Sequence, residues 1–139
     1  VAGGDAPAGT TNVLVFGCSV SRPPERLLLP LARISDDLPF HHALFTSITL
    51  HGTETIGKLS LEKDLDHVNR MASDWLHLQD AEGTTAVSAV QTHPTVADTA
   101  RALVALCEAL PEGKNSPVRV FLCGSLYLVG GFLQLLFIF

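Results

Sequence analysis

Hydrophobic residues along the chain follow two spacings that alternate with each other. Short apolar runs, such as NVLVFG at Asn12–Gly17, are typical of strands buried on both faces. Leu61–Leu78 instead repeats its apolar residues about every 3.6 positions, which predicts an amphipathic helix. The predicted strands are 12–17, 43–50, 84–90 and 117–123, and the predicted helices follow Pro23 and Pro24, cover 61–78 and 95–110, and begin again at Gly124 and Ser125.

Strands that alternate with helices predict a parallel sheet covered on both faces. The predicted domain occupies residues 12–139, after a Gly-rich linker at 1–11. Four strands make a thin open sheet, so we expect a further βα unit upstream. Ligands of such sheets lie beyond the carboxyl ends of the strands. The candidate segments are therefore 17–22, 46–51, 91–95 and 124–127.

Composition narrows the class of protein. The chain has 139 residues, of which 47% are hydrophobic and 17% are charged, so it is not a disordered tail. The 9 Lys and Arg against 14 Asp and Glu give a net charge of -5, which argues against nucleic-acid binding. Three cysteines are too few for a disulfide framework and indicate a reducing compartment.

The loop after the first predicted strand carries three candidate chemistries. Gly17–Ser21 (GCSVS) resembles the nucleophile elbow G-x-S-x-G, but Ser21 replaces the last glycine and an ordinary βα loop is the better interpretation. A serine hydrolase that uses Ser19 stays a remote alternative. Cys18 and Arg22 are too close in sequence for a phosphate-cradling thiolate loop. Arg22 alone can meet a phosphate or carboxylate bidentately, although a solvated arginine remains the simpler interpretation.

Metal and nucleotide motifs are weak. The six histidines form no H-x-x-x-H pair and the cysteines no C-x-x-C pair, so we expect no zinc site. GSLYLVGG at Gly124–Gly131 lacks the spacing and the lysine of a phosphate loop. It still predicts a helix opening whose free amides and Ser125 hydroxyl can hold a carboxylate or phosphate. The alternative is that Gly124 only allows a tight turn and Ser125 only caps the helix.

The uncharged run Val120–Phe139 allows a different class of protein. Twenty apolar residues in one helix would cross a bilayer, which makes a small tail-anchored membrane protein the alternative. Gly124 inside the run favours a strand followed by a buried helix instead.

Three segments resemble folylpolyglutamate synthases. Val120–Leu136 (VFLCGSLYLVGGFLQLL) is similar to the family's "GSLHLVGG…L.LL" segment, with Tyr127 where many eukaryotic members have His. Val15–Pro24 (VFGCSVSRPP) is similar to the "LFN…RDP" loop, with Gly17 and Pro23 in place of Asn and Asp. Phe40–Phe45 (FHHALF) is similar to the following "F-D-x-A-V-F" strand. The segments keep the family's order.

The resemblance implies an ATP-dependent ligase of the Mur-ligase-like family that adds glutamate to the γ-carboxyl of a folate through an acyl phosphate. It implies a Rossmann-like three-layer α/β/α domain with a mainly parallel sheet, lacking the first βα unit, whose strand ends in D-G-A-H. This would be the C-terminal domain, inactive alone. ATP and magnesium would be bound mainly by the missing N-terminal ATPase domain.

The resemblance also assigns residues and partners. Ser125 and Gly124 in the helix opening, together with Arg22, would bind substrate, whereas no residue is expected to be catalytic or to bind metal. The expected partners are folate, glutamate and the ATPase domain, with no nucleic acid and no membrane. We expect a monomer in the cytosol or the mitochondrion.

Overall fold

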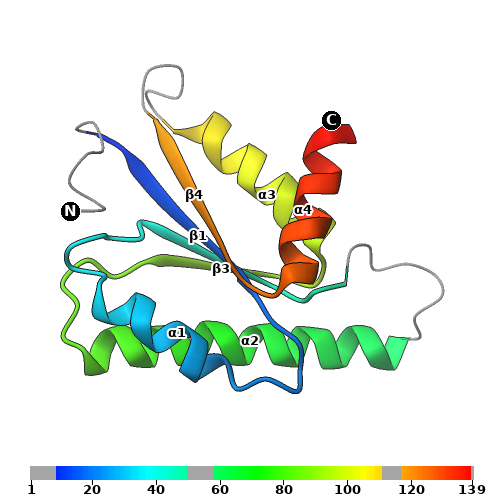
Figure 1. Cartoon of the computed structure of the whole chain (residues 1–139), viewed down its shortest axis with the longest axis horizontal. Coiled ribbons are helices and arrows are strands. Elements are labelled where there is room, and N and C mark those ends of the chain that lie inside the picture. The colour runs from blue at the N-terminus through cyan, green and yellow to red at the C-terminus, as the bar shows by residue number, and fades with distance from the viewer. Residues whose placement is uncertain (1–8, 50–57, 111–116, 139) are drawn as a thin grey trace.

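The computed structural model of the chain describes residues 9–49, 58–110 and 117–138. All described strands are parallel and lie in one sheet with the order β3-β2-β1-β4 (Figure 1). Helices cover both faces, so the predicted three-layer α/β domain is confirmed. The elements are β1 (Thr11–Gly17), α1 (Pro24–Arg33), β2 (His42–Thr46), α2 (Lys58–Ala81), β3 (Ala89–His93), α3 (Val96–Ala109), β4 (Val118–Gly124) and α4 (Leu126–Ile138).

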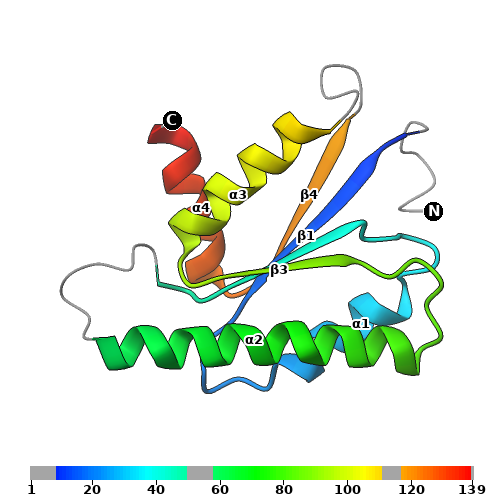
Figure 2. The ribbon, with the colours of Figure 1, turned by 180° about the vertical axis from the view of Figure 1, so that it is seen from behind.

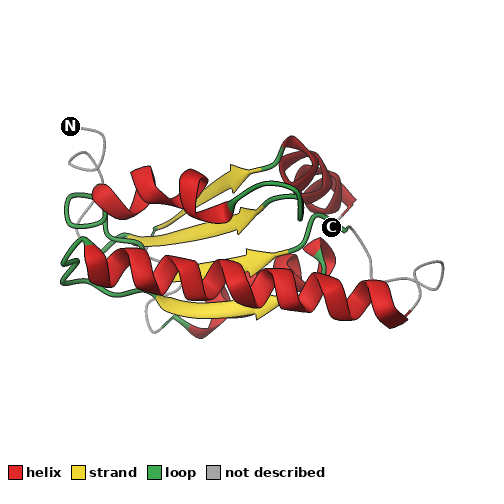
Figure 3. Cartoon of the chain, turned by 90° about the horizontal axis from the view of Figure 1, so that it is seen from below, coloured by secondary structure: helices red, strands yellow, loops and turns green. Residues whose placement is uncertain are grey.

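The central strand β1 explains the layering. Its residues point alternately to the two faces, because side chains of a strand alternate with a period of two. Leu14 and Phe16 pack with α1 and α2, whereas Val13 and Val15 pack with α3 and α4. Figures 2 and 3 show the two helix pairs on opposite sides of the sheet. A strand that is buried on both faces needs a continuous apolar run, as Val13–Phe16 provides.

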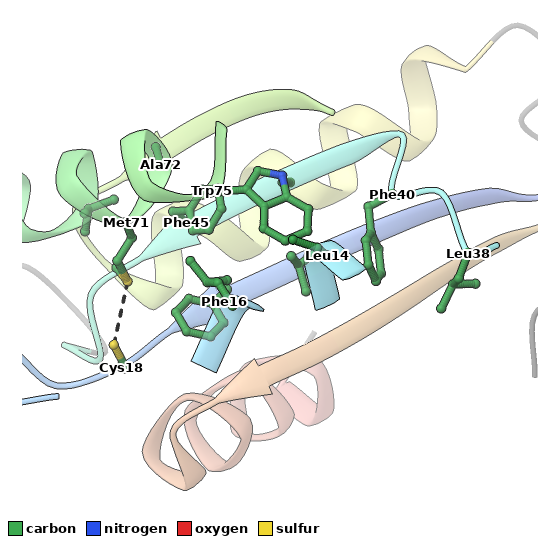
Figure 4. Packing of buried hydrophobic residues seen from close by; sticks show 13 residues of the cluster. Leu14, Phe16, Cys18, Leu38, Phe40, Phe45, Met71, Ala72 and Trp75 are labelled. Atoms are coloured by element: carbon green, nitrogen blue, oxygen red, sulfur yellow. Dashed lines mark hydrogen bonds between the residues drawn. The ribbon is translucent and has the colours of Figure 1, made fainter. Parts of the chain in front are cut away.

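The face covered by α1 and α2 has an aromatic core (Figure 4). Phe40 makes edge contacts with Trp75 and Phe121, with ring centroids 5.9 and 5.5 Å apart. Phe16 meets Phe45 in the same manner at 6.2 Å. Such edge-to-face pairs add to the stabilisation from burial.

The third strand lies further along the chain than its pattern predicted. Residues 84–88 of the predicted strand form a bend and loop instead, and β3 begins at Ala89. Gly83, at φ +69°, ends α2, and the N–H of Thr84 donates to the carbonyl of Gln79. Pairing with β2 then sets the register, with Ala89 opposite His42. The prediction was wrong because pairing with β2 overrides local β-propensity.

Several predicted boundaries also shift. The linker predicted at 1–11 ends before Thr11, whose N–H already donates to Pro117 O at 3.0 Å. Residues 58–60, predicted as loop, belong to α2. Residues 1–8 of the predicted linker, Leu50, the loop at 51–57 and the turn at 111–116 lie outside the described residues.

The uncharged run that begins at Val120 divides into the end of β4 and the helix α4. Gly124 joins them at φ +113°, as the strand-to-helix interpretation predicted. One side of α4 packs on the sheet through Leu128, Phe132 and Leu135. Within the described ranges, no helix combines the length and the apolar character that crossing a membrane requires.

Candidate anion-binding site

A pocket of about 390 Å³ lies beyond the carboxyl ends of β1, β2 and β4. It is the place where an open parallel sheet presents its loops and helix N-termini. All three residues that the sequence assigned to substrate binding line this pocket. The lining residues are Ser19, Arg22, Ile48, Gly124, Ser125, Leu126 and Tyr127.

Two glycines allow β1 and β4 to end in close contact. Gly17 and Gly124 are paired in the sheet, and a Cβ on Gly124 would overlap the carbonyl oxygen of Gly17. A Cβ on Gly17 would lie 2.7 Å from the carbonyl oxygen of Thr46. The N–H of Ser125 donates to Gly17 O at 2.9 Å. This close approach holds the first residues of α4 against the end of β1.

Ser125 caps α4. Its Oγ accepts the N–H of Tyr127 at 3.1 Å, and its carbonyl accepts the N–H of Val129 at 3.2 Å. A serine at this position satisfies one of the free amides of the first turn while its own O–H remains a donor. The N-terminus of α4 therefore brings partial positive charge and a hydroxyl donor to the pocket.

Arg22 supplies the full positive charge of the pocket. Its backbone N–H donates to Ser19 O at 3.1 Å, which makes a turn in the loop between β1 and α1. Within the described ranges, ion pairs involve Arg33 and Arg101, and none involves Arg22. A guanidinium beside a helix N-terminus favours an anion such as a carboxylate or phosphate.

Arg22 also borders a second pocket, of about 600 Å³, between its own loop and α2. Burial and the neighbouring charge of Glu25 raise the pKa of Asp74 in this pocket, against the opposing effects of Arg70 and His77. Positive and negative side chains are mixed here, so the pocket has no clear preference for anions. Its charged residues are Arg22, Glu25, Lys63, Asp66, Arg70 and Asp74, with His67 beside them.

Sequence reasoning missed the part that His67 has in this region. Its Nε2 lies 2.9 Å from Cys18 O, and as an N–H it donates to that carbonyl. The loop after β1 is therefore tied to α2. The sequence spacing could have indicated this contact. His67 lies four residues before Met71, so both side chains lie on the side of α2 that faces the core.

The two nucleophiles considered for this loop lie in unsuitable surroundings. Burial raises the pKa of the Cys18 thiol, although the charge of Arg22 partly offsets this. Its Sγ lies 3.9 Å from the Sδ of Met71, so it behaves as a core thiol (Figure 4). Ser19 Oγ shares a hydrogen bond of 2.9 Å with Ser21 Oγ in an exposed loop. Because α1 begins only at Pro24, the turn is not a nucleophile elbow.

The pocket does not fit a magnesium ion. Mg²⁺ prefers carboxylate oxygens, and the lining residues include no Asp or Glu. In the part of the chain that the structure describes, no group of three or more His, Cys, Asp and Glu side chains could hold a metal. The donors that are present suit an anion.

Together, the sheet order and the pocket define a Rossmann-like three-layer α/β/α domain with a candidate anion site at its carboxyl edge. Comparisons with protein-family models, curated proteins and solved structures found no match to this chain.

Proposed function

We propose that this chain is the substrate-binding C-terminal domain of an ATP-dependent ligase of the folylpolyglutamate synthase class. One observation carries the proposal. Two segments that resemble the family, Val15–Pro24 and Val120–Leu136, lie far apart in the sequence, yet residues from both line one pocket. The two segments begin in the neighbouring parallel strands β1 and β4, and the resemblance assigns residues of both to substrate binding.

The chemistry of the pocket suits glutamate. Arg22 can hold a carboxylate bidentately, and Ser125 with the first turn of α4 adds neutral donors. Binding the carboxylate of glutamate would leave its amine free to attack an activated folate carboxyl. This domain would therefore position the incoming amino acid, and holding it near the reacting carboxyl lowers the entropic part of the barrier.

ATP, when bound, supplies the phosphoryl group that activates the folate carboxyl. The described residues of this chain offer no magnesium ligands at the pocket, so the proposal assigns ATP and magnesium to an ATPase domain of the same protein. The 139-residue chain alone is then expected to show no glutamate ligation. Turnover above background by this chain would contradict that assignment. The proposed class of enzyme also implies a cytosolic or mitochondrial location.

A binding experiment tests the proposal directly. Titration of the ¹⁵N-labelled chain with L-glutamate is expected to shift amide signals of Ser125 and Tyr127, with a dissociation constant on the order of 1 mM. Arg22→Gln and Ser125→Ala should each weaken binding several-fold. Arg101→Gln is the matched control, because Arg101 is exposed and pairs with Asp98 on α3. Equal binding by all three variants would exclude this pocket as the glutamate site.

A second experiment uses an enzyme in which this chain is joined to its ATPase domain. Ser125→Ala is expected to raise the KM for glutamate more than it lowers kcat, because the hydroxyl contacts the bound amino acid. An unchanged KM would remove Ser125 from the site.

A further inference from the structure

Three side chains with metal-binding atoms meet where the loop after β1 contacts α2. Cys18 Sγ lies 3.9 Å from the Sδ of Met71 and 3.9 Å from the Nε2 of His67. Figure 4 shows the two sulfur atoms facing each other. His67 and Met71 are four residues apart on α2, so their side chains are neighbours on one face of the helix. A thiol, a thioether and an imidazole therefore share one location.

The spacing of these atoms suits an ion with three ligands. Metal–sulfur bonds of about 2.3 Å and metal–imidazole bonds of about 2.0 Å, the lengths found at zinc, place neighbouring donors roughly 3.7–4.0 Å apart in a planar three-ligand site. Both separations from Cys18 Sγ, at 3.9 Å each, fall in this range. The two sulfur atoms can therefore bind one ion with little movement of the loop or the helix.

The location is sheltered from water but has an entry path. Cys18 and Met71 are 1% and 0% exposed, and His67 is 9% exposed. His67 also borders the pocket of about 600 Å³ between the loop and α2. An ion that enters through this pocket reaches His67 first and then the two more deeply buried sulfur atoms.

The types of donor and the local charge select a monovalent copper ion. Thiolate and thioether sulfur are soft ligands, which favour Cu⁺ over hard ions such as Mg²⁺. Cu⁺ bound to one thiolate is neutral, whereas Zn²⁺ would leave a positive charge buried and prefers four ligands. The charge of Arg22 already acts on Cys18, so a further positive charge there is unfavourable.

We propose that Cys18, His67 and Met71 form a buried site for one Cu⁺ ion. On binding, the thiol releases its proton to solvent and its sulfur bonds to the ion, while copper stays in the +1 state. The ring proton of His67 moves through solvent from Nε2 to Nδ1, so that the Nε2 lone pair binds the ion. The hydrogen bond from Nε2 to Cys18 O is thereby exchanged for a bond to copper.

This site is independent of the ligase function, and it departs from the expectation that no residue binds metal. Competition with a chromophoric Cu⁺ chelator in the absence of oxygen measures its affinity. The wild-type chain is expected to take up one Cu⁺, and Cys18→Ala should lose it. Cys107→Ala is the matched control and should keep the ion, because Cys107 packs on the other face of the sheet. A wild-type chain that binds no Cu⁺ would overturn the proposal, as would loss of the ion from Cys107→Ala alone.

Met71→Leu is the most specific variant, because leucine nearly keeps the buried volume and removes the thioether. It should bind Cu⁺ at least about tenfold more weakly, since even the outer partners of metal ligands contribute about 10–100-fold to affinity. His67→Gln should weaken binding by a similar factor. His77→Gln, at an exposed position of the same helix, should leave the affinity unchanged. Circular dichroism of the copper-free variants checks that each one folds.

X-ray absorption at the copper edge identifies the ligands directly. Two sulfur ligands and one nitrogen ligand are expected for the wild type, and one sulfur ligand fewer for Met71→Leu. A folded Met71→Leu chain with the affinity and the ligands of the wild type would overturn the proposal, because copper would then be bound elsewhere.

Discussion

The two faces of the sheet are packed by different kinds of side chain. The face under α1 and α2 is closed by large aromatic groups, among them Phe40 and Trp75. The face under α3 and α4 is mostly aliphatic, and Ala97 and Ala100 let α3 lie close to the strands. The first face depends on a few large rings, and the second depends on the close approach of backbones. The candidate anion site borders the second face, where α4 begins.

A buried polar network strengthens the contrast. On the aromatic face, the indole N–H of Trp75 and the amide of Gln79 donate to Ser88 Oγ, each at 3.1 Å. Ser88 in turn donates to Phe40 O at 2.6 Å. This network ties α2 to the segment before β3, so loss of one ring affects several elements. Disruption of this face should therefore cost the most stability.

Trp75→Ala is expected to have the largest effect, lowering the free energy of unfolding by about 4 kcal/mol through a cavity beside Phe40. Leu128→Ala, its counterpart on the other face, is expected to cost about 3 kcal/mol. Urea denaturation of both variants measures the difference. Trp75→Phe keeps an aromatic ring at this position but removes the hydrogen bond to Ser88. It is expected to lower the free energy of unfolding by about 1–2 kcal/mol. A larger loss of stability for Leu128→Ala than for Trp75→Ala would contradict the expectation that the aromatic face contributes more.

Gly124→Ala tests the close backbone approach on the side of the site. The added Cβ would overlap Gly17 O, and the positive φ is unfavourable for alanine, so we expect a loss of roughly 2–3 kcal/mol. Amide signals of Ser125 and its neighbours should also shift, because α4 would move from the end of β1. If thermal unfolding shows that Gly124→Ala is as stable as the wild type, the ends of β1 and β4 can move apart without a loss of stability.

Thr95→Ala tests the cap of α3. Thr95 Oγ1 accepts the N–H of Asp98 at 3.1 Å and donates to its carboxylate at 2.8 Å. Loss of the cap is expected to cost about 1 kcal/mol at neutral pH. Ser73→Ala, an exposed hydroxyl on α2, is the control and should change little.

The same variant has a predicted pH dependence. Burial acts to raise the pKa of Asp98, but hydrogen bonds from Thr95 and Arg101 outweigh it and leave the pKa below its usual value. A lowered pKa stabilises the fold at pH values above about 4, and this contribution is lost as the pH falls through the folded-state pKa. The deficit of Thr95→Ala should therefore be smaller near pH 2 than at pH 7. An equal deficit at both would contradict this role of the carboxylate.

Gly130→Ala should have the smallest effect and the opposite sign. Gly130 lies inside α4, and a Cβ there would meet nothing within 4 Å. Alanine is expected to stabilise the helix by about 0.5–1 kcal/mol, since glycine is a poor helix former. Compared with Gly124→Ala, it separates a glycine required by close packing from one that is not. A destabilised Gly130→Ala variant would contradict this distinction.

Local sequence patterns predicted most helices and strands well. They failed where the pairing of one strand with another determined which residues form the strand. The continuous apolar run at Val13–Phe16 and the helical spacing from Leu65 to Trp75 are encoded in short windows, and both elements were predicted. The third strand was misplaced, because its residues Gln91–His93 are polar and only the register with β2 selects them. Ser88 looked like part of that strand and is instead the centre of a buried network.

The sequence by itself determined the class of fold, because the period of apolar residues specifies each element and alternating elements specify a parallel sheet. Local chemistry also selected Arg22 and Ser125 as candidates, and the resemblance to a known family added Gly124. Only the tertiary structure decided that they line one pocket, that His67 contacts the backbone of Cys18, and that β1 lies between β2 and β4 in the described sheet. These facts depend on which strands pair. A short stretch of sequence does not specify the distance between residues that are far apart in the chain.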